Sequence, residues 1–418
     1  MRKVTLSLAG AVVLASISMS AHAGALENII SNPKVSLELR PRYEYVDQDG
    51  KTDEANALTM RTALGLNAQL FGVDGLGAQL QVINVANATT DYAPEDSTPG
   101  KYPTVADPSQ TRVTQANVSY AADGFVVLAG RKMVVLDNAR FIGNVGWRQM
   151  PQTYDLAAVI YNGIPNLSLL GAYVWNVNRI FAKDGDGPLN KHLKTGSVLL
   201  HAAYKFSPAI TATVYDYMIE NFADHIGIRL TGTYNLNGIK LKYTGEYAVQ
   251  NDPSLDDSDH PLYSPTRSED ADYYNLNLAG AYNGFIAGIG YEVLSDKGDG
   301  DFAFWTPLAT LHAMNGWADM FLKTPDEGLE DLSIKLGYNF GAYGKIIGIY
   351  HDFQSDKKNT AGDDDLGSEI DVAYKYKINK NLGLLLKYAD YNSGDASFNK
   401  PDTTKYWVQF DYKFAASL

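Results

Sequence analysis

The chain has 418 residues, a formal net charge of −13 and no cysteine. The lack of cysteine excludes disulfide scaffolds and thiolate metal sites, and the acidic balance argues against nucleic acid as a partner. Its 28 tyrosines and 37 glycines are typical of β-structure whose two faces meet different surroundings.

The first segment has the pattern of a secretory leader. A basic head, Arg2-Lys3, precedes an apolar stretch from Val4 to Met19 and an A-x-A site at Ala21-His22-Ala23. The apolar stretch is too short for a spanning helix, and no later segment has the ~18 consecutive apolar residues that such a helix needs. We therefore expect residues 1–23 to be a signal peptide and residues 24–418 to form a single exported domain.

Alternating apolar and polar residues follow along the rest of the chain. They predict roughly 18 strands, most of them long enough to cross a bilayer when tilted. The expected strands cover 35–46, 57–70, 76–87, 110–121, 124–132, 153–162, 166–177, 195–206, 209–219, 225–235, 238–249, 271–282, 285–294, 331–339, 344–354, 367–378, 382–393 and 404–414.

The connections between these strands alternate in length. Those after the even-numbered strands are short and contain Gly, Pro or Asn, as tight hairpins require. They include Ala122–Asp123, Ser207–Pro208, Leu236–Asn237 and Asn283–Gly284. Those after the odd-numbered strands are mostly long, as in 88–109, 133–152, 178–194, 250–270 and 295–330. This segregation predicts an all-β fold, a transmembrane antiparallel β-barrel with short periplasmic turns and long outer loops, in the outer membrane of a Gram-negative bacterium.

The last strand carries an aromatic face. Tyr406, Val408, Phe410, Tyr412 and Phe414 share one side of the strand, which we expect to contact lipid. The stretch resembles the C-terminal insertion signal of outer-membrane barrels, although four residues follow Phe414. The resemblance implies the barrel-assembly machinery as a partner.

The opposite parity predicts which side chains face the lumen. By this rule 11 basic and 6 acidic residues point inward. The basic set is Arg40, Arg42, Arg61, Arg229, Lys240, Lys242, Lys335, Lys375, Lys377, Lys387 and Lys413, and the acidic set is Glu38, Glu44, Glu246, Glu369, Asp371 and Asp411. A water-filled pore with a positive excess concentrates anions. The alternative is that these arginines and carboxylates only pair across the wall and keep it rigid.

Two loops are too apolar to be plain surface loops. Residues 131–155 interleave Arg131, Arg140 and Arg148 with Phe141 and Trp147, which is typical of a loop folded into the pore as a constriction. Residues 305–331 repeat apolar side chains at helical spacing, which predicts a short helix over or inside the barrel mouth. The alternative for both is packing on the barrel rim, and the sequence leaves open whether the loops 131–152 and 295–330 enter the pore.

No metal, cofactor or catalytic centre is predicted. Lys183-Asp-Gly-Asp-Gly187 and Asp299-Gly-Asp301 do not match the spacing of a calcium loop. The histidines after the leader are scattered, and no nucleophile-elbow, zinc-protease or phosphate-loop motif is present. We therefore do not expect an enzyme.

Three stretches carry a family resemblance. GRKMVVLDNARFIGNVGWRQMPQTYD, PLATLHAMNGWADMFLKTPDEGLEDL and the opening LELRPRYEYV are similar to the alginate-export family of outer-membrane porins. The resemblance implies a barrel of about this strand count, an arginine-lined lumen, loops folded over the pore and passive movement of anionic solutes. Arg131, Arg140 and Arg148 lie in its signature region.

The expected function is passive diffusion that favours anions, such as sugar acids or anionic polysaccharide. The predicted pathway residues are Arg40, Arg42, Arg61, Arg131, Arg140, Arg148, Arg229 and Lys242. A general diffusion porin without strong selectivity and a structural envelope barrel remain alternatives. Partners would be outer-membrane lipid and a small or polymeric anion, whose identity the sequence leaves open.

Overall fold

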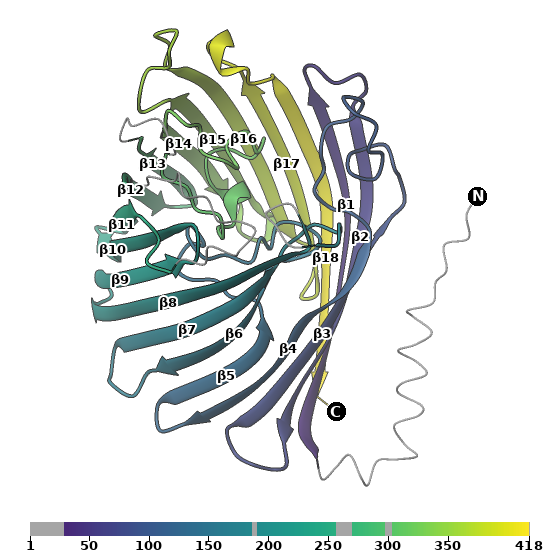
Figure 1. The fold of residues 1–418 in the computed structure, drawn as a ribbon, viewed down its shortest axis with the longest axis vertical. Helices are drawn as coiled ribbons and strands as arrows, with labels where there is room; N and C mark the ends of the chain where they lie inside the picture. The colour runs from purple at the N-terminus through teal and green to yellow at the C-terminus, as the bar shows by residue number, and fades with distance from the viewer. Residues whose placement is uncertain (1–28, 186–189, 256–269, 297–302, 418) are drawn as a thin grey trace.

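A computed structural model describes residues 29–185, 190–255, 270–296 and 303–417. The predicted leader, and most of the polar loop 250–270, lie outside the described residues. One antiparallel sheet of 18 strands closes on itself, because β1 pairs with both β2 and β18 (Figure 1). The predicted barrel and its strand number are confirmed.

The strands follow the predicted order. Three of them, 76–87, 271–282 and 285–294, have the predicted bounds. The strands are β1 (Ile30–Gln48), β2 (Ala55–Leu70), β3 (Leu76–Asn87), β4 (Gln110–Ala122), β5 (Phe125–Lys132), β6 (Thr153–Tyr161), β7 (Leu167–Asn178), β8 (His192–Ser207), β9 (Ile210–Ile219), β10 (Ala223–Leu236), β11 (Ile239–Asn251), β12 (Ala271–Tyr282), β13 (Phe285–Leu294), β14 (Leu329–Asn339), β15 (Lys345–Gln354), β16 (Asp365–Lys377), β17 (Leu382–Asn392) and β18 (Thr403–Ser417).

Three short turns show why the hairpins form where they do. Asp123-Gly124, Asn237-Gly238 and Asn283-Gly284 each have positive φ at both residues. This geometry matches the twist of the flanking strands and favours Asn-Gly or Asp-Gly. The predicted turns Ala122–Asp123 and Leu236–Asn237 are therefore wrong by one residue, because the left-handed pair includes the following glycine.

The long connections gather at one end of the barrel and the short turns at the other. In Figure 1 the C-terminus lies at the lower end, with short hairpins such as β4–β5. Short turns mark the periplasmic end of such barrels, so the long loops face outward. Across the described ranges, no helix combines the length and hydropathy that a membrane crossing requires.

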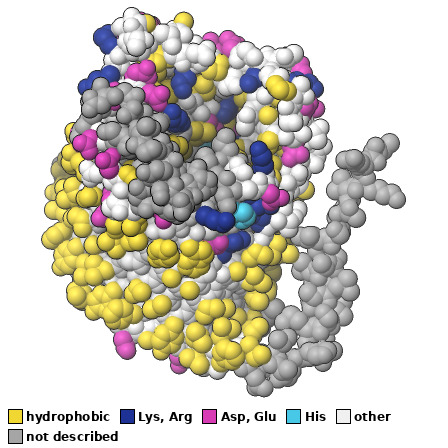
Figure 2. Space-filling model, viewed as in Figure 1, with side chains coloured by type: hydrophobic (Ala, Val, Ile, Leu, Met, Phe, Trp, Pro, Cys, Tyr) yellow, Lys and Arg dark blue, Asp and Glu magenta, His cyan; other side chains and the backbone are white. Residues whose placement is uncertain are grey.

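The outer wall carries an apolar belt. Figure 2 shows hydrophobic side chains covering the lower part of the outside wall, whereas Lys, Arg, Asp and Glu gather above it. On β18, Tyr406, Val408, Phe410 and Phe414 are 38–46% exposed. Trp407 points the opposite way and is 1% exposed. The aromatic face of the last strand is thus on the outside, as its alternation predicts.

Candidate solute pathway

Two long connections turn back into the barrel and pack on each other. We call residues 133–152 the first inward loop and residues 303–328 the second inward loop (Figure 1). The backbone N–H of Gly143 donates to the carbonyl of Leu308, and that of Thr310 donates to Ala139, both across 2.9 Å. The sequence left open whether these loops enter the barrel, and their contacts with inward-facing wall residues, described below, place the described parts of both loops inside it.

The predicted helix in the second inward loop is largely absent. Only Leu311–Ala313 form a single 3₁₀ turn. Asn315, Gly316 and Asp319 have positive φ, which an α-helix cannot continue through. The helical spacing of the apolar residues instead reflects separate insertions into the core, because Leu308 and Phe321 are buried at opposite ends of an irregular segment.

An apolar core lies within the barrel, between the loops and one wall. Phe141 of the first inward loop has its ring 5.0 Å from that of Tyr215, 5.4 Å from that of Tyr273 and 5.9 Å from that of Phe304. All four side chains are at most 5% exposed. Aromatic pairs at these distances add to the stability that apolar burial supplies. This part of the cross-section is therefore filled by protein rather than by water.

The three arginines predicted on the first two strands each hold a carboxylate. The ion pairs are Arg40–Asp411 (2.8 Å), Arg42–Asp107 (3.2 Å) and Arg61–Glu38 (3.4 Å). Arg40 and Arg42 also donate to backbone carbonyls of the first inward loop, at Gly146 and Trp147. These guanidinium groups thus fasten the loop to the wall, and Arg42 has only 1% of its surface exposed.

The loop arginines are paired as well. Arg140 Nε lies 3.1 Å from Glu292 Oε1 of β13, an ion-pair distance whose angle does not suit a hydrogen bond. Arg148 Nη1 lies 3.2 Å from Glu44 of β1, and its Nη2 donates to Asp319 of the second inward loop across 2.7 Å. Buried pairs of this kind cost several kcal/mol to break, because one charge is then left unpaired.

Arg131 and Arg229 complete the paired set. Arg131, near the end of β5, makes two hydrogen bonds to Asp155 of β6, at 2.6 and 2.9 Å. Arg229 of β10 forms an ion pair with Glu246 of β11. Seven of the eight predicted pathway residues are therefore neutralised by a carboxylate among the described residues, and Lys242 is the exception.

Lysines near the short turns differ from these arginines. Lys242 shares inward parity with Glu246, and Lys335 shares it with Asp331. Neither lysine has an ion pair within the described ranges. The same holds for four further lysines of this lower half of the lumen, Lys240, Lys345, Lys375 and Lys377. Among the predicted pathway residues and these lysines, the cations without a carboxylate partner thus lie below the loops.

A buried cluster that the sequence did not predict joins the loops to the last two strands. The His312 ring stacks on Trp147 at 4.4 Å, and its Nε2 accepts from the Lys387 ammonium across 2.7 Å. The same ammonium lies 3.8 Å from the ring centre of Trp317 and 4.1 Å from that of Trp147. Cations placed over tryptophan faces are stabilised when desolvated.

Two titratable residues of this cluster, His312 and Asp319, have shifted pKa values. Burial lowers the pKa of His312 well below its usual range, although Asp319 opposes the shift. Burial alone would raise the pKa of Asp319, but His312, Lys405 and Arg148 together lower it well below its usual range. Neutral His312 donates through Nδ1 to Asp319 across 2.7 Å, which leaves Nε2 as the acceptor for Lys387.

Solved structures resemble this fold across nearly the whole chain. OpdO of Pseudomonas aeruginosa matches with a TM-score of 0.70 and 17% identity, over 93% of this chain and 99% of that one. The outer membrane protein opdK of the same organism matches with a TM-score of 0.71 and 14% identity, over 93% and 100%. OccAB4 of Acinetobacter baumannii matches with a TM-score of 0.72 and 15% identity, over 93% and 100%. No protein-family model matches the chain, and no curated protein matches it.

These likenesses correct the family resemblance. The structures that match 93% of the chain belong to the Opd and Occ proteins, so the predicted resemblance to the alginate-export family is wrong. The closed barrel with its apolar outer belt is that of an outer-membrane protein of a Gram-negative bacterium.

Proposed function

We propose that the chain is a passive channel of the outer membrane that favours small anions. The observation that carries the proposal is the separation of charge inside the barrel. At the level of the inward loops each of the predicted arginines has a carboxylate, whereas six lysines below that level have none among the described residues. Paired charges contribute little net field, so the six lysines supply a positive potential in the part of the lumen below the loops.

In this arrangement we expect the lysines, rather than the arginines, to determine the anion selectivity. Arg42, Arg140 and Arg148 are at most 5% exposed, and they hold loops and wall together. The lysines end in mobile ammonium groups on flexible stems, which attract an anion without binding it in a fixed geometry. Weak and repeated contacts of this kind allow a solute to enter and leave.

The filled upper lumen favours compact solutes over polymers. The inward loops form a packed core with Tyr215 and Tyr273, so a wide passage for polysaccharide does not fit this arrangement. One of the similar proteins, OpdK, has been crystallised with vanillate, which is a small carboxylate. Small organic acids are therefore the solutes that we propose, and catalysis is not part of the proposal.

Reversal potentials in planar bilayers test this function. Under a KCl gradient the wild-type channel should show a chloride permeability above that of potassium. The triple variant Lys240→Gln, Lys375→Gln, Lys377→Gln should bring the permeability ratio toward one, because these exposed lysines lose their charge. The control is the double variant Arg131→Gln, Asp155→Asn, which removes both partners of an ion pair, keeps the net charge and should leave the ratio nearly unchanged. A wild-type channel with no anion preference would refute the proposal.

A further inference from the structure

The four strands β11 to β14 carry a row of side chains with an unusual order. Across the sheet, Lys242 pairs with Ala279, Ala279 with Gly288, and Gly288 with Lys335. Directly paired residues point to the same side of a sheet, so all four face the lumen. A charged side chain thus stands at each end of the row, and the two positions between them are nearly empty.

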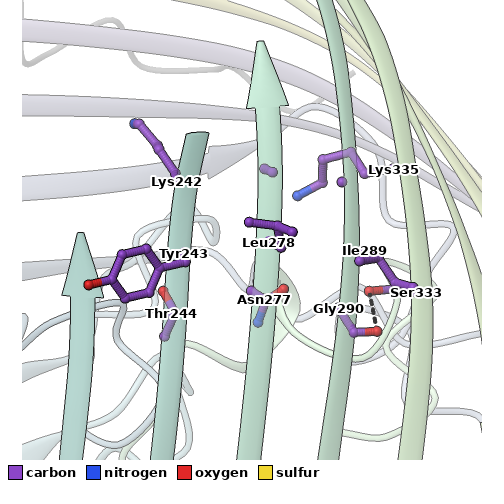
Figure 3. A pocket seen from close by; sticks show the side chains of 11 residues that line it. Lys242, Tyr243, Thr244, Asn277, Leu278, Ile289, Gly290, Ser333 and Lys335 are labelled. Atoms are coloured by element: carbon purple, nitrogen blue, oxygen red, sulfur yellow. Dashed lines mark hydrogen bonds between the residues drawn. The ribbon is translucent and has the colours of Figure 1, made fainter. Parts of the chain in front are cut away.

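The empty positions make a hollow in the inner wall. Figure 3 shows Lys242 and Lys335 on either side of it, on strands separated by β12 and β13. The hollow has a volume of about 140 Å³. Pockets for drug-sized ligands have about 300–1,000 Å³, so this one suits a more compact molecule. Neighbouring strands lie about 4.8 Å apart, which separates the two lysine Cα atoms by about 14 Å.

The next row toward the loops is polar and uncharged. It runs Thr244, Asn277, Gly290 and Ser333 in direct register. A Cβ at Gly290 would lie 2.5 Å from Asn277 Oδ1 and 2.7 Å from Ser333 Oγ, so a larger residue would push these groups out of place. The glycine therefore keeps an amide and a hydroxyl side by side at the edge of the hollow.

The third row up is acidic, but its carboxylates are occupied. Glu292 accepts hydrogen bonds from Tyr273 across 2.6 Å and from Asn315 across 2.7 Å. Asp331 lies 2.8 Å from His351 Nδ1, and Glu246 pairs with Arg229. Because Asn315 and Arg140 come from the inward loops, this row is where the loops dock. The hollow row thus lies two rows below the row where the loops dock, and the single row between them has no carboxylate.

We propose that this hollow is a binding site for a small dicarboxylate, held by Lys242 at one end and Lys335 at the other. Two cations that face each other across a neutral floor match a molecule with two anionic ends. The amide and hydroxyls of the polar row can bind hydroxyl groups on the chain between those ends. Ammonium groups on flexible stems release a carboxylate more readily than a paired guanidinium fork would, as transport requires.

This site rests on the proposed channel function, and its test uses a separate measurement. Titration calorimetry on the detergent-solubilised barrel measures binding of succinate and of acetate without any current. Succinate should bind at least about tenfold more tightly than acetate. Lys242→Gln and Lys335→Gln should each weaken succinate binding about threefold, the gain expected from one exposed ion pair, and the double variant about tenfold. Lys377→Gln, which removes an unpaired lysine outside the hollow, is the matched control and should bind succinate as the wild type does.

A variant that keeps every charge separates a site from a diffuse field. Gly288→Val fills the floor of the hollow, where an added Cβ would lie 3.1 Å from the Leu278 carbonyl and 3.2 Å from the Ala279 side chain. It should weaken succinate binding while the chloride preference in KCl remains. Equal binding of succinate and acetate, or unchanged succinate affinity in the double lysine variant, would overturn the site even where the reversal potential supports an anion channel. Heat-resistant migration on gels verifies that the barrel wall, which forms the hollow, is closed in each variant.

Discussion

Arg148 of the first inward loop donates to Asp319 of the second across 2.7 Å, and both side chains are buried. The same guanidinium lies 3.2 Å from Glu44 on the barrel wall. One side chain thus ties two loops, which are far apart in the sequence, to each other and to β1. The charges in this part of the barrel act as fasteners, which is the alternative that the pattern of arginines and carboxylates had left open.

Removing Arg148 should loosen both loops. We expect Arg148→Gln to destabilise the docked loops by about 3–5 kcal/mol, because Glu44 is then buried without its cationic partner and Asp319 loses one of its own. Thermal melts followed by the fluorescence of the loop tryptophans, Trp147 and Trp317, measure this loss. Arg131→Gln is the comparison, since its pair with Asp155 is partly exposed and should contribute at most about 1 kcal/mol. Equal effects of the two variants would contradict the fastening role of Arg148.

Acid should weaken the same contacts in two stages. Burial lowers the pKa of His312, so the imidazole binds a proton more readily in the released loop than in the docked loop. Protonation therefore favours release, and docking weakens as the pH falls below about 6.5. The pKa of Asp319 is lowered by its cationic partners, so its contribution is present above about 4 and is lost as the pH falls further. Conductance noise recorded from pH 7.5 to 3.5 should rise in these two windows. His312→Gln should abolish the first rise and keep the second.

A glycine in the second inward loop should tolerate no side chain. Gly316 has a φ of +83°, and a Cβ there would lie 2.3–2.8 Å from the carboxylate of Glu369. That carboxylate accepts from the backbone N–H groups of Trp317 and Ala318. We expect Gly316→Ala to weaken loop docking by about 1–3 kcal/mol, which hydrogen exchange at these two amides measures. Gly50→Ala is the matched control, because Gly50 also has positive φ but no atom within 4 Å of the added Cβ.

The last strand should be sensitive to loss of its outer aromatic face. Phe414→Ser together with Tyr412→Ser should reduce the yield of assembled barrel, because the strand then presents polar groups to lipid. Deleting residues 415–418 should cost less, although Ala415, Ala416 and Ser417 do pair with β1. The deletion removes three of 13 paired positions and leaves ten. A deletion as harmful as the double substitution would show that the assembly signal lies in the final residues.

Raised salt should reduce the anion preference. The unpaired lysines face water, so their field is screened as the Debye length falls from ~10 Å at 0.1 M to ~3 Å at 1 M. Permeability ratios measured at constant gradient and increasing ionic strength should therefore approach one. A ratio that is independent of salt would point instead to buried charges, such as Arg42 or Arg148, as its source.

The sequence predicted the barrel well because its information is local. Alternation along each strand and the Asp-Gly and Asn-Gly turns decide strand number and order without reference to distant residues. The interior charge balance was harder to predict. The parity argument counted Arg229 and Glu246 but omitted Glu292 and Asp331, which lie on predicted strands with the same inward parity. Counting them would have reduced the apparent basic excess.

The pairing of Arg42 and Arg148 could not be predicted from the strands. Asp107 and Asp319 lie in long loops, and only the folded path of those loops brings them to Arg42 and Arg148. The Lys387 cluster has the same origin, since Trp147, His312 and Trp317 come from two loops that share no sequence pattern with β17. The sequences of these loops resembled a family, whereas the structure shows that several of their apolar side chains, including Phe141, Leu308 and Phe321, are buried in the core.

The aromatic core around Phe141 means that this barrel has two apolar surfaces with opposite requirements. The outer belt is stable only where lipid or detergent covers it, whereas the core between the loops and the wall is stable because water is excluded from it. Detergent can replace lipid on the outer belt, but it can also bind the apolar side chains of the core and so compete with the packing of the loops on the wall. Solubilised protein should therefore undergo two separate transitions, with loop release preceding the opening of the wall. Heat-resistant migration on a gel detects only whether the barrel wall is closed. A molecule whose loops have been released, and whose passage has therefore changed, would still migrate as an intact barrel.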